Sequence, residues 1–423
     1  MARRPTRPSR RAFLGGAASL ALTGGLSRPA RAATNGRPFR NLVVYFAYGG
    51  WDQAMCFDPK PGVSSVVVPP GEVQSAHGLD FYAVNGAPAV PSFFAEHGDK
   101  VALMRGLDMV SLSHEICRRY ALTGSADGRK ADLAAIIASI TGADRPLPYL
   151  MMSSRAMPGP LAGLAGWLGR GNQLGQLLNP DMGMAPMPTL GLPPQEAVDP
   201  VADWLAGRHA RAQEEFHSDK AKALWGDFGA GQERVASLEA HRDGFRGFNE
   251  LEVVDNQVDM ALHVLQHGLV RSVMIDSGNN WDTHYDNNLQ IRYYDRMFTA
   301  LGRLMQGLKS APGVDGGTLL DETVVWVVSE MGRPPGMNDG YGKEHLPFTS
   351  SLLMGGGVKG GQMIGATDDR LIGQRVNLQT GALDDAGSLV RPDQLVAGLL
   401  EGCGVRADRW LPNVTPFMGP FES

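Results

Sequence analysis

Carboxylates and imidazoles follow short apolar runs at several places in this chain. The clearest run is 273–275, a buried-strand pattern, which turn-forming residues 277–280 separate from Asp282 and His284. A carboxylate and an imidazole two residues apart on such a loop can converge on one cation. The alternative is an aspartate that caps the next helix beside a solvated histidine. The spacing alone leaves both interpretations open.

Polar side chains also follow three other apolar runs. Asp52 follows the run 41–47, and the run 101–104 is followed by Ser111, Ser113 and His114. The run 323–328 is followed by Glu330 and Arg333, and His345 lies on the loop beyond. In open α/β sheets, ligands bind outside the carboxyl ends of the strands. Carboxylates and imidazoles recurring at one sheet edge indicate a hard or borderline divalent cation with mixed oxygen and nitrogen ligands. The sequence therefore predicts a metal site at this edge.

A hydroxyl beside such an ion would be a candidate nucleophile. Ser113 stands at the N-cap position of an expected helix over 115–122, and Ser111 lies just before it. Helix amides can stabilise an anion there, and a metal ion lowers the pKa of a bound hydroxyl. Arg333 could then hold an anionic substrate oxygen through a bidentate contact.

The elements that must position these residues alternate between strands and helices. Strands are expected at 41–47, 101–104, 149–152, 273–275, 323–328 and 352–354, and helices at 91–96, 115–122, 131–140, 256–266, 289–308 and 391–402. This alternation predicts a mainly parallel sheet covered on both faces. We interpret the Pro- and Gly-rich stretch 59–88 as a surface excursion. Residues 157–250 are interpreted as an insertion that ends in charged, solvent-exposed helices over 201–248.

Three other features favour structural roles. His263 and His267 have helical spacing, but they precede a strand and lack the H-E-x-x-H glutamate. The glycine-rich run 355–361 lacks a Gly-Lys-Ser/Thr motif, so it predicts tight turns rather than a phosphate loop. The three cysteines have no metal-site or disulfide spacing, and we expect them to be buried: Cys56, Cys117 and Cys403.

The first 32 residues are expected to be an export signal. Residues 9–14 form a twin-arginine motif, a mildly apolar segment spans 15–26, and 30–32 would precede cleavage before Ala33. The alternative is a cytosolic protein with a basic arm. The apolar segment is too short and Gly-rich for a membrane span. Seven of the 39 basic residues lie in this signal, which leaves 32 against 44 acidic residues. This acidic balance argues against a nucleic-acid partner.

The ordered set of motifs resembles a large bacterial family of exported proteins of unknown function within the alkaline-phosphatase-like superfamily. The motifs are the twin-arginine start, Gly49-Gly50-Trp51-Asp52, Ser113-His114, Trp281-Asp282-Thr283-His284, Ser329-Glu330-Met331-Gly332-Arg333 and 355–361. The resemblance implies an α/β/α sandwich with a central mainly parallel sheet. It also implies a Ser, Thr or modified Cys nucleophile at a helix N-terminus, flanked by one or two divalent ions (zinc, manganese or calcium).

Carried over by motif, the metal ligands would be Asp52, Asp282, His284 and His345, and the nucleophile Ser113 or Ser111. Glu330-Met331 stands where the superfamily usually has an Asp-His pair, and Met331 is a poor ligand for a hard ion. A second metal site is therefore doubtful.

Two functions remain. The first is a periplasmic metal-dependent hydrolase of small anionic phosphate or sulfate esters. The second is a non-catalytic exported protein on the same fold that binds a ligand or assembles at the cell surface. On either interpretation the export partner is the twin-arginine translocation machinery. The polar residues at strand ends favour the enzyme, and Met331 favours the alternative.

Overall fold

An eight-stranded sheet forms the centre of the computed structural model, which describes residues 35, 37–168, 174, 178, 195–215, 218–245, 253–314 and 316–422. Its strands are β1 (Asn41–Phe46), β4 (Val101–Asp108), β5 (Tyr149–Met151), β6 (Ala165–Trp167), β7 (Ser272–Asp276), β8 (Thr323–Val328), β9 (Phe348–Gly355) and β10 (Gln362–Ile364). The order is β10-β4-β9-β8-β1-β7-β5-β6. Every neighbouring pair is parallel except the two that involve β9. The predicted mainly parallel sheet is confirmed.

The sheet is buried on both faces because its central strands carry apolar side chains on alternate sides. All six residues of β1 are buried. Val43 and Tyr45 contribute to one core, whereas Leu42, Val44 and Phe46 contribute to the other. Such continuous apolar runs are typical of parallel strands with helices on both faces.

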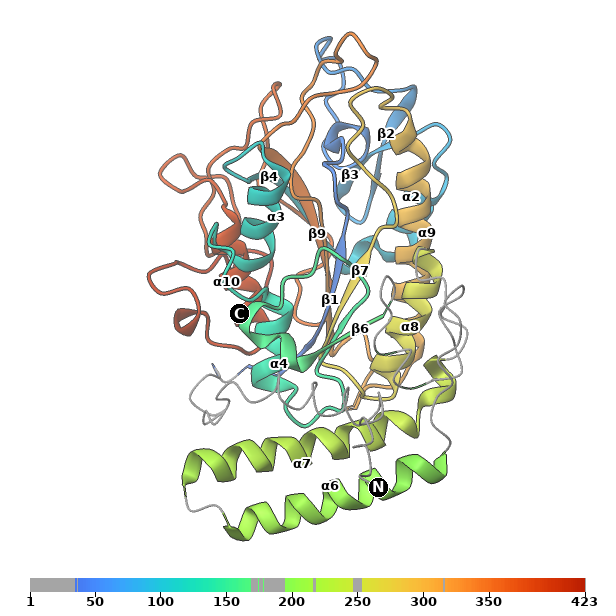
Figure 1. Cartoon of the computed structure of the whole chain (residues 1–423). Helices are drawn as coiled ribbons and strands as arrows, with labels where there is room; N and C mark the ends of the chain where they lie inside the picture. The colour runs from blue at the N-terminus through green and yellow to red at the C-terminus, as the bar shows by residue number, and fades with distance from the viewer. Residues whose placement is uncertain are drawn as a thin grey trace.

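Helices cover both faces, as Figure 1 shows. One layer contains α2 (Ala89–His97), α8 (Val254–Gln266) and α9 (Leu289–Ser310), and the other contains α3 (His114–Thr123), α4 (Leu133–Thr141) and α10 (Pro392–Gly402). Short 3₁₀ helices occur at Gln53–Met55, Gly98–Lys100, Gly159–Leu164, Arg242–Phe245 and Ala407–Arg409. The predicted α/β/α sandwich is confirmed. None of the described helices is long and apolar enough to cross a membrane.

The stretch 59–88, interpreted as a surface excursion, contains two strands that the sequence did not predict. This stretch contains an antiparallel hairpin, β2 (Gly71–Ala76) and β3 (Leu79–Val84). Only β3 is substantially buried, whereas β2 is polar and mostly exposed. A strand without a buried face gives little alternation of apolar and polar residues, so the pattern was missed.

The predicted charged helices are present as α6 (Gln195–Glu215) and α7 (Asp219–Glu239), which lie side by side at one end of the molecule (Figure 1). Arg234 of α7 donates a hydrogen bond to the carbonyl of Ala143, which lies just beyond the end of α4. That position is the amino edge of the sheet, because α4 ends where the chain turns into β5. The predicted signal over 1–32 lies outside the described residues.

The opposite, carboxyl edge gathers the predicted site residues. Strands β1, β4, β7 and β8 run in the same direction, so their following loops lie at one edge. Strand β9 runs the other way and therefore begins at that edge, which places the preceding loop there as well. Three of these loops supply the cluster described next.

A candidate metal centre at the carboxyl edge

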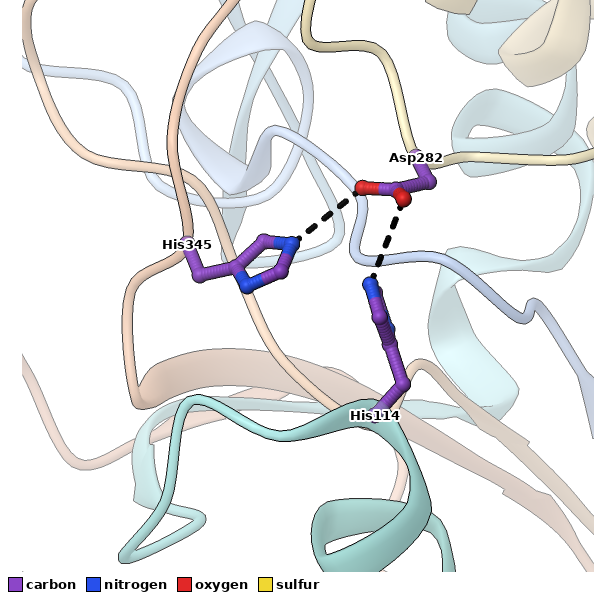
Figure 2. Close-up of side chains that lie close together, drawn as sticks. All are labelled: His114, Asp282 and His345. Carbon is purple, nitrogen blue, oxygen red and sulfur yellow. Dashed lines mark hydrogen bonds and ion pairs between the residues drawn. The ribbon is translucent and has the colours of Figure 1, made fainter.

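His114, Asp282 and His345 meet at this edge from three distant parts of the chain (Figure 2). His114 is the first residue of α3, Asp282 lies after β7, and His345 precedes β9. His114 Nε2 lies 3.4 Å from Asp282 Oδ2, and His345 Nε2 lies 3.2 Å from Asp282 Oδ1. One ligand-type atom from each residue lies within 4.8 Å of the others. The three side chains are half-buried, so the cluster is open on one side.

The other ring nitrogen of each histidine is held by an acceptor. His114 Nδ1 lies 2.8 Å from Glu330 Oε1, and His345 Nδ1 lies 2.9 Å from the carbonyl oxygen of Leu112. Because these oxygens only accept hydrogen bonds, each Nδ1 carries the proton. In the neutral ring, Nε2 then presents a lone pair to Asp282. Metal-binding histidines are typically oriented in this way.

His284 repeats this arrangement at the margin of the cluster. Its Nδ1 lies 3.2 Å from Glu344 Oε2, and its Nε2 lies 3.0 Å from both Asp282 Oδ1 and His345 Nε2. His284 therefore adjoins the three-residue group and could serve as a further ligand.

An imidazole lone pair that points at a carboxylate oxygen is repelled by it, unless a proton or a metal ion lies between the two atoms. In the metal-free protein, protons would fill this role. Burial lowers the pKa of His114, but hydrogen bonds with Asp282 and Glu330 outweigh burial and raise that pKa to about 9. Burial raises the pKa of Asp282, but hydrogen bonds from His114, His345 and Arg333 lower it well below its usual range.

This donor set fits a divalent metal ion. Two imidazole nitrogens and one carboxylate oxygen match the three protein ligands of catalytic zinc sites, which keep one position open. Manganese also accepts mixed nitrogen and oxygen ligands. Calcium prefers six to eight oxygen ligands, so it fits this histidine-rich set less well.

Glu330, predicted as a metal ligand, is not part of the three-residue group and contacts His114 Nδ1 instead. Its fully buried carboxylate accepts hydrogen bonds from the Gly49 amide and from His114 Nδ1, both at 2.8 Å. Those contacts use Oε1, and Ser329 Oγ lies 3.5 Å from Oε2. The role of Glu330 is therefore to fix the ring and tautomer of His114.

The prediction of Asp52 as a metal ligand also needs correction. Asp52 Oδ2 lies 2.8 Å from the ammonium of Lys343 and accepts a hydrogen bond of 2.7 Å from Asn287. Asp52 and Lys343 are both fully buried. The lysine supplies the cation that this carboxylate requires. The sequence could not pair the two because they lie in distant segments.

Arg333, predicted to hold an anionic substrate oxygen, is occupied by contacts within the protein. Its side chain is fully buried. It donates hydrogen bonds to the backbone carbonyls of Gly49, Gly50, Trp281, Lys343 and Glu344, and to Asp282 Oδ1 at 2.6 Å. The guanidinium therefore ties the three loops together and holds the Asp282 carboxylate in place.

The two predicted nucleophiles lie beside His114 on the approach to α3. Ser113 is the exposed N-cap residue of α3, and its side chain makes no capping hydrogen bond. Ser111 is half-buried, and its hydroxyl accepts a hydrogen bond of 3.1 Å from the Ser113 amide. Ser113 therefore has the freer hydroxyl of the two.

Sequence reasoning missed Tyr48, whose ring lies beside His114, and Arg155, which stacks on Tyr48. The ring centres of Tyr48 and His114 lie 5.3 Å apart, and the Arg155 guanidinium carbon lies 3.6 Å from the centre of the Tyr48 ring. Both residues follow strands, β1 and β5, at the carboxyl edge. That shared position is the signal that could have identified them.

The other motifs have the structural roles that the sequence favoured. His263, His267 and His241 lie close together near the amino edge, but within the described residues only the His114 group meets the geometry of a metal site. The three cysteines are buried and free. The glycine-rich run forms the turn between β9 and β10.

A family model described as "Protein of unknown function (DUF1501)" matches residues 40–405. The chain belongs to this family. The match includes all five predicted metal ligands and both serines. No curated protein matches the chain.

Two solved structures resemble the DUF1501 chain at low identity. One is a protein in the alkaline phosphatase superfamily from Vibrio parahaemolyticus. Its sequence identity is 12% and its TM-score is 0.38, and the match covers 94% of this chain and 76% of that chain. The other comes from work on glycosaminoglycan metabolism by Bacteroides thetaiotaomicron. Its sequence identity is 11% and its TM-score is 0.35, and the match covers 90% of this chain and 76% of that chain.

Proposed function

We propose that this protein is a metal-dependent hydrolase of small phosphate or sulfate esters. The observation that carries the proposal is the convergence of His114, Asp282 and His345, with each histidine held through Nδ1 by an acceptor. The Nε2 atoms of both histidines point at the Asp282 carboxylate, an arrangement in which one divalent ion could contact all three residues. We infer one ion, because Lys343 neutralises Asp52 and the described residues contain no second group of three or more side chains that could hold a metal ion.

The chain's own residues prepare this chemistry. When bound, the ion would polarise an ester oxygen and lower the pKa of a hydroxyl or water beside it. Glu330 and the Leu112 carbonyl fix the two imidazoles, and Arg333 fixes Asp282. The ligand atoms are thus positioned before a substrate arrives, which is the main structural requirement for electrostatic catalysis.

Ser113 is the better candidate for the nucleophile. It lies next to His114 at the N-terminus of α3, where free amides favour an anion. Its hydroxyl makes no capping hydrogen bond, whereas the hydroxyl of Ser111 accepts a hydrogen bond from the Ser113 amide. A Ser113→Ala variant that keeps full activity would assign the attack to water instead.

Ester hydrolysis with and without metal tests the proposal. Purified protein is assayed with aryl phosphate and aryl sulfate monoesters after chelation and after return of zinc or manganese. We expect turnover that depends on metal and falls to background in Asp282→Ala with His345→Ala. His267→Ala, an exposed histidine at the amino edge, is the matched control and should retain activity. Metal uptake without turnover of either ester class would reject hydrolysis of these esters.

Binding without catalysis is the second candidate function. Arg333 is fully occupied by backbone carbonyls and Asp282, so the cation predicted for the substrate is not available. Uptake of metal and anions without hydrolysis of any ester would support this function.

We also propose export by the twin-arginine machinery, on the basis of residues 9–14 and 30–32. Replacement of Arg10 and Arg11 by lysine should retain the full-length precursor inside the cell. N-terminal sequencing of exported protein should begin at Ala33.

A further inference from the structure

We propose that Arg155 binds the tetrahedral oxyanion of the substrate beside the metal ion, in the role that the sequence assigned to Arg333. This inference rests on the proposed function, because it places an anion next to the cluster of His114, Asp282 and His345. It adds a residue that lies outside every motif of the sequence.

The first observation is that Arg155 lies beside Tyr48, whose ring is next to His114. Its guanidinium carbon lies 3.6 Å from the centre of the Tyr48 ring, and that ring lies 5.3 Å from the ring of His114. The guanidinium is therefore no farther from the His114 ring centre than these two distances combined. Arg155 follows β5, at the same edge as the other site loops.

The second observation is that the Arg155 guanidinium has no ion-pair partner among the described residues. Two other arginines are committed to partners: Arg333 to five carbonyls and Asp282, and Arg118 of α3 to Glu115 at 2.7 Å. Within the described part of the chain, the Arg155 guanidinium forms no ion pair, and its contact is the face of Tyr48. Stacking on an aromatic ring holds a guanidinium in place while its N–H groups remain free to bind an anion.

The third observation is the balance of charge among the side chains around the cluster. Asp282, Glu330 and Glu344 carry three negative charges around the cluster, and a divalent ion together with Arg333, which pairs with Asp282, would balance them. Lys343 is already balanced by Asp52. Arg155 then gives the site a net positive charge, and its planar fork can contact two oxygens of a phosphate or sulfate group. The half-buried side chain is accessible to such a ligand.

Direct anion binding tests this assignment. Inorganic phosphate and inorganic sulfate are titrated separately by calorimetry into wild type and Arg155→Ala, each with and without one equivalent of metal. We expect Arg155→Ala to retain its metal content but to bind the preferred anion about 10- to 100-fold more weakly. Arg155→Lys, which keeps the charge but loses the fork, should fall between the two.

Two control variants separate the role of Arg155 from general effects. Arg129→Ala removes an exposed arginine that pairs with Asp127, and it should leave anion binding unchanged. Tyr48→Phe keeps the ring under Arg155 and should bind like wild type, whereas Tyr48→Leu removes the ring and should bind more weakly.

The outcomes distinguish this inference from the function on which it rests. Metal-loaded wild type that binds neither anion would overturn it, and so would an Arg155→Ala variant with wild-type anion affinity. Failure of wild type to take up metal would instead overturn the proposed function. In that case the metal-free titrations still decide on Arg155, because the comparison with Arg155→Ala needs no metal.

Discussion

At the scale of single residues, a partner from elsewhere in the chain decides what each side chain does. Asp52 and Arg333 lie at the predicted sheet edge, yet neither belongs to the group of His114, Asp282 and His345. Lys343 neutralises Asp52, and the loop carbonyls occupy Arg333. The sequence shows which residue types gather at the edge, because strand direction determines that. It does not show which of them pair, because pairing depends on side-chain contacts between distant loops.

The Asp52–Lys343 pair predicts a specific pattern of stability. Removing one member of a buried ion pair typically costs about 3–5 kcal/mol, whereas replacing both members costs much less. Asp52→Asn should therefore lower the free energy of unfolding strongly, and Lys343→Met added to it should recover most of the loss. Urea unfolding of the two single variants and the double variant measures this. Equal, additive losses would show that the pair is not coupled.

His114 predicts how metal binding depends on pH. In the metal-free protein its pKa is raised from 6.5 to about 9. The charged ring therefore stabilises the fold fully below about pH 6.5, and this contribution is lost as the pH rises through about 9. A metal ion requires the neutral ring, so binding at pH 7 should release about one proton.

Metal affinity should accordingly increase between pH 7 and pH 9. Proton release in a weakly buffered titration and affinities across this range give the measurement. His267→Ala serves as the control and should show the same dependence as wild type. An affinity that stays flat from pH 7 to pH 9 would be inconsistent with His114 as a ligand.

At the scale of elements, the strands and helices were largely predictable and the loop contacts were not. β8 has the predicted bounds, and α8 begins two residues before its predicted start. These elements have strong apolar periodicity, which reports burial directly. The β2–β3 hairpin was missed because its outer strand is polar. The site loops are held by contacts such as Gln290 with Gly50 and Trp281, which no local pattern encodes.

Gly49, in the loop after β1, allows that loop to approach the backbone of Asp282 closely. It has a φ of +119°, and a side chain there would clash with the backbone of Trp281 and Asp282. Gly49→Ala should destabilise the protein by about 1–3 kcal/mol and displace Asp282, so that metal binding weakens.

Gly62→Ala is the matched control, because Gly62 has a φ of +80° but open space around it. It should cost some stability from backbone strain and leave metal affinity intact. Thermal unfolding and metal titration of both variants make the comparison. If Gly62→Ala weakened metal binding as much as Gly49→Ala, the close approach of Gly49 to Asp282 would not be the cause.

At the scale of the whole molecule, the cluster links three regions that are far apart in sequence. His114 belongs to the first third of the chain, and Asp282 and His345 come from two later loops. An ion bound by all three stabilises only the folded state. At a free concentration 100 times the dissociation constant, the gain is about 2.7 kcal/mol.

Thermal unfolding should therefore show a metal-dependent increase in Tm. The Asp282→Ala, His345→Ala variant should show none. The hairpin of α6 and α7 lies at the opposite edge, where Arg234 contacts Ala143. Arg234→Ala should leave the metal-dependent increase in Tm unchanged. An increase that persists in the double variant would place the stabilising ion elsewhere.

Anomalous diffraction tests the central claim most directly. Crystals of wild-type protein grown with zinc or manganese would be measured at the absorption edge of the metal. We predict one anomalous peak about 2.0–2.2 Å from His114 Nε2, from an Asp282 oxygen and from His345 Nε2. A peak beside Asp52 instead, or no peak at the cluster in crystals saturated with metal, would contradict the assignment of this site.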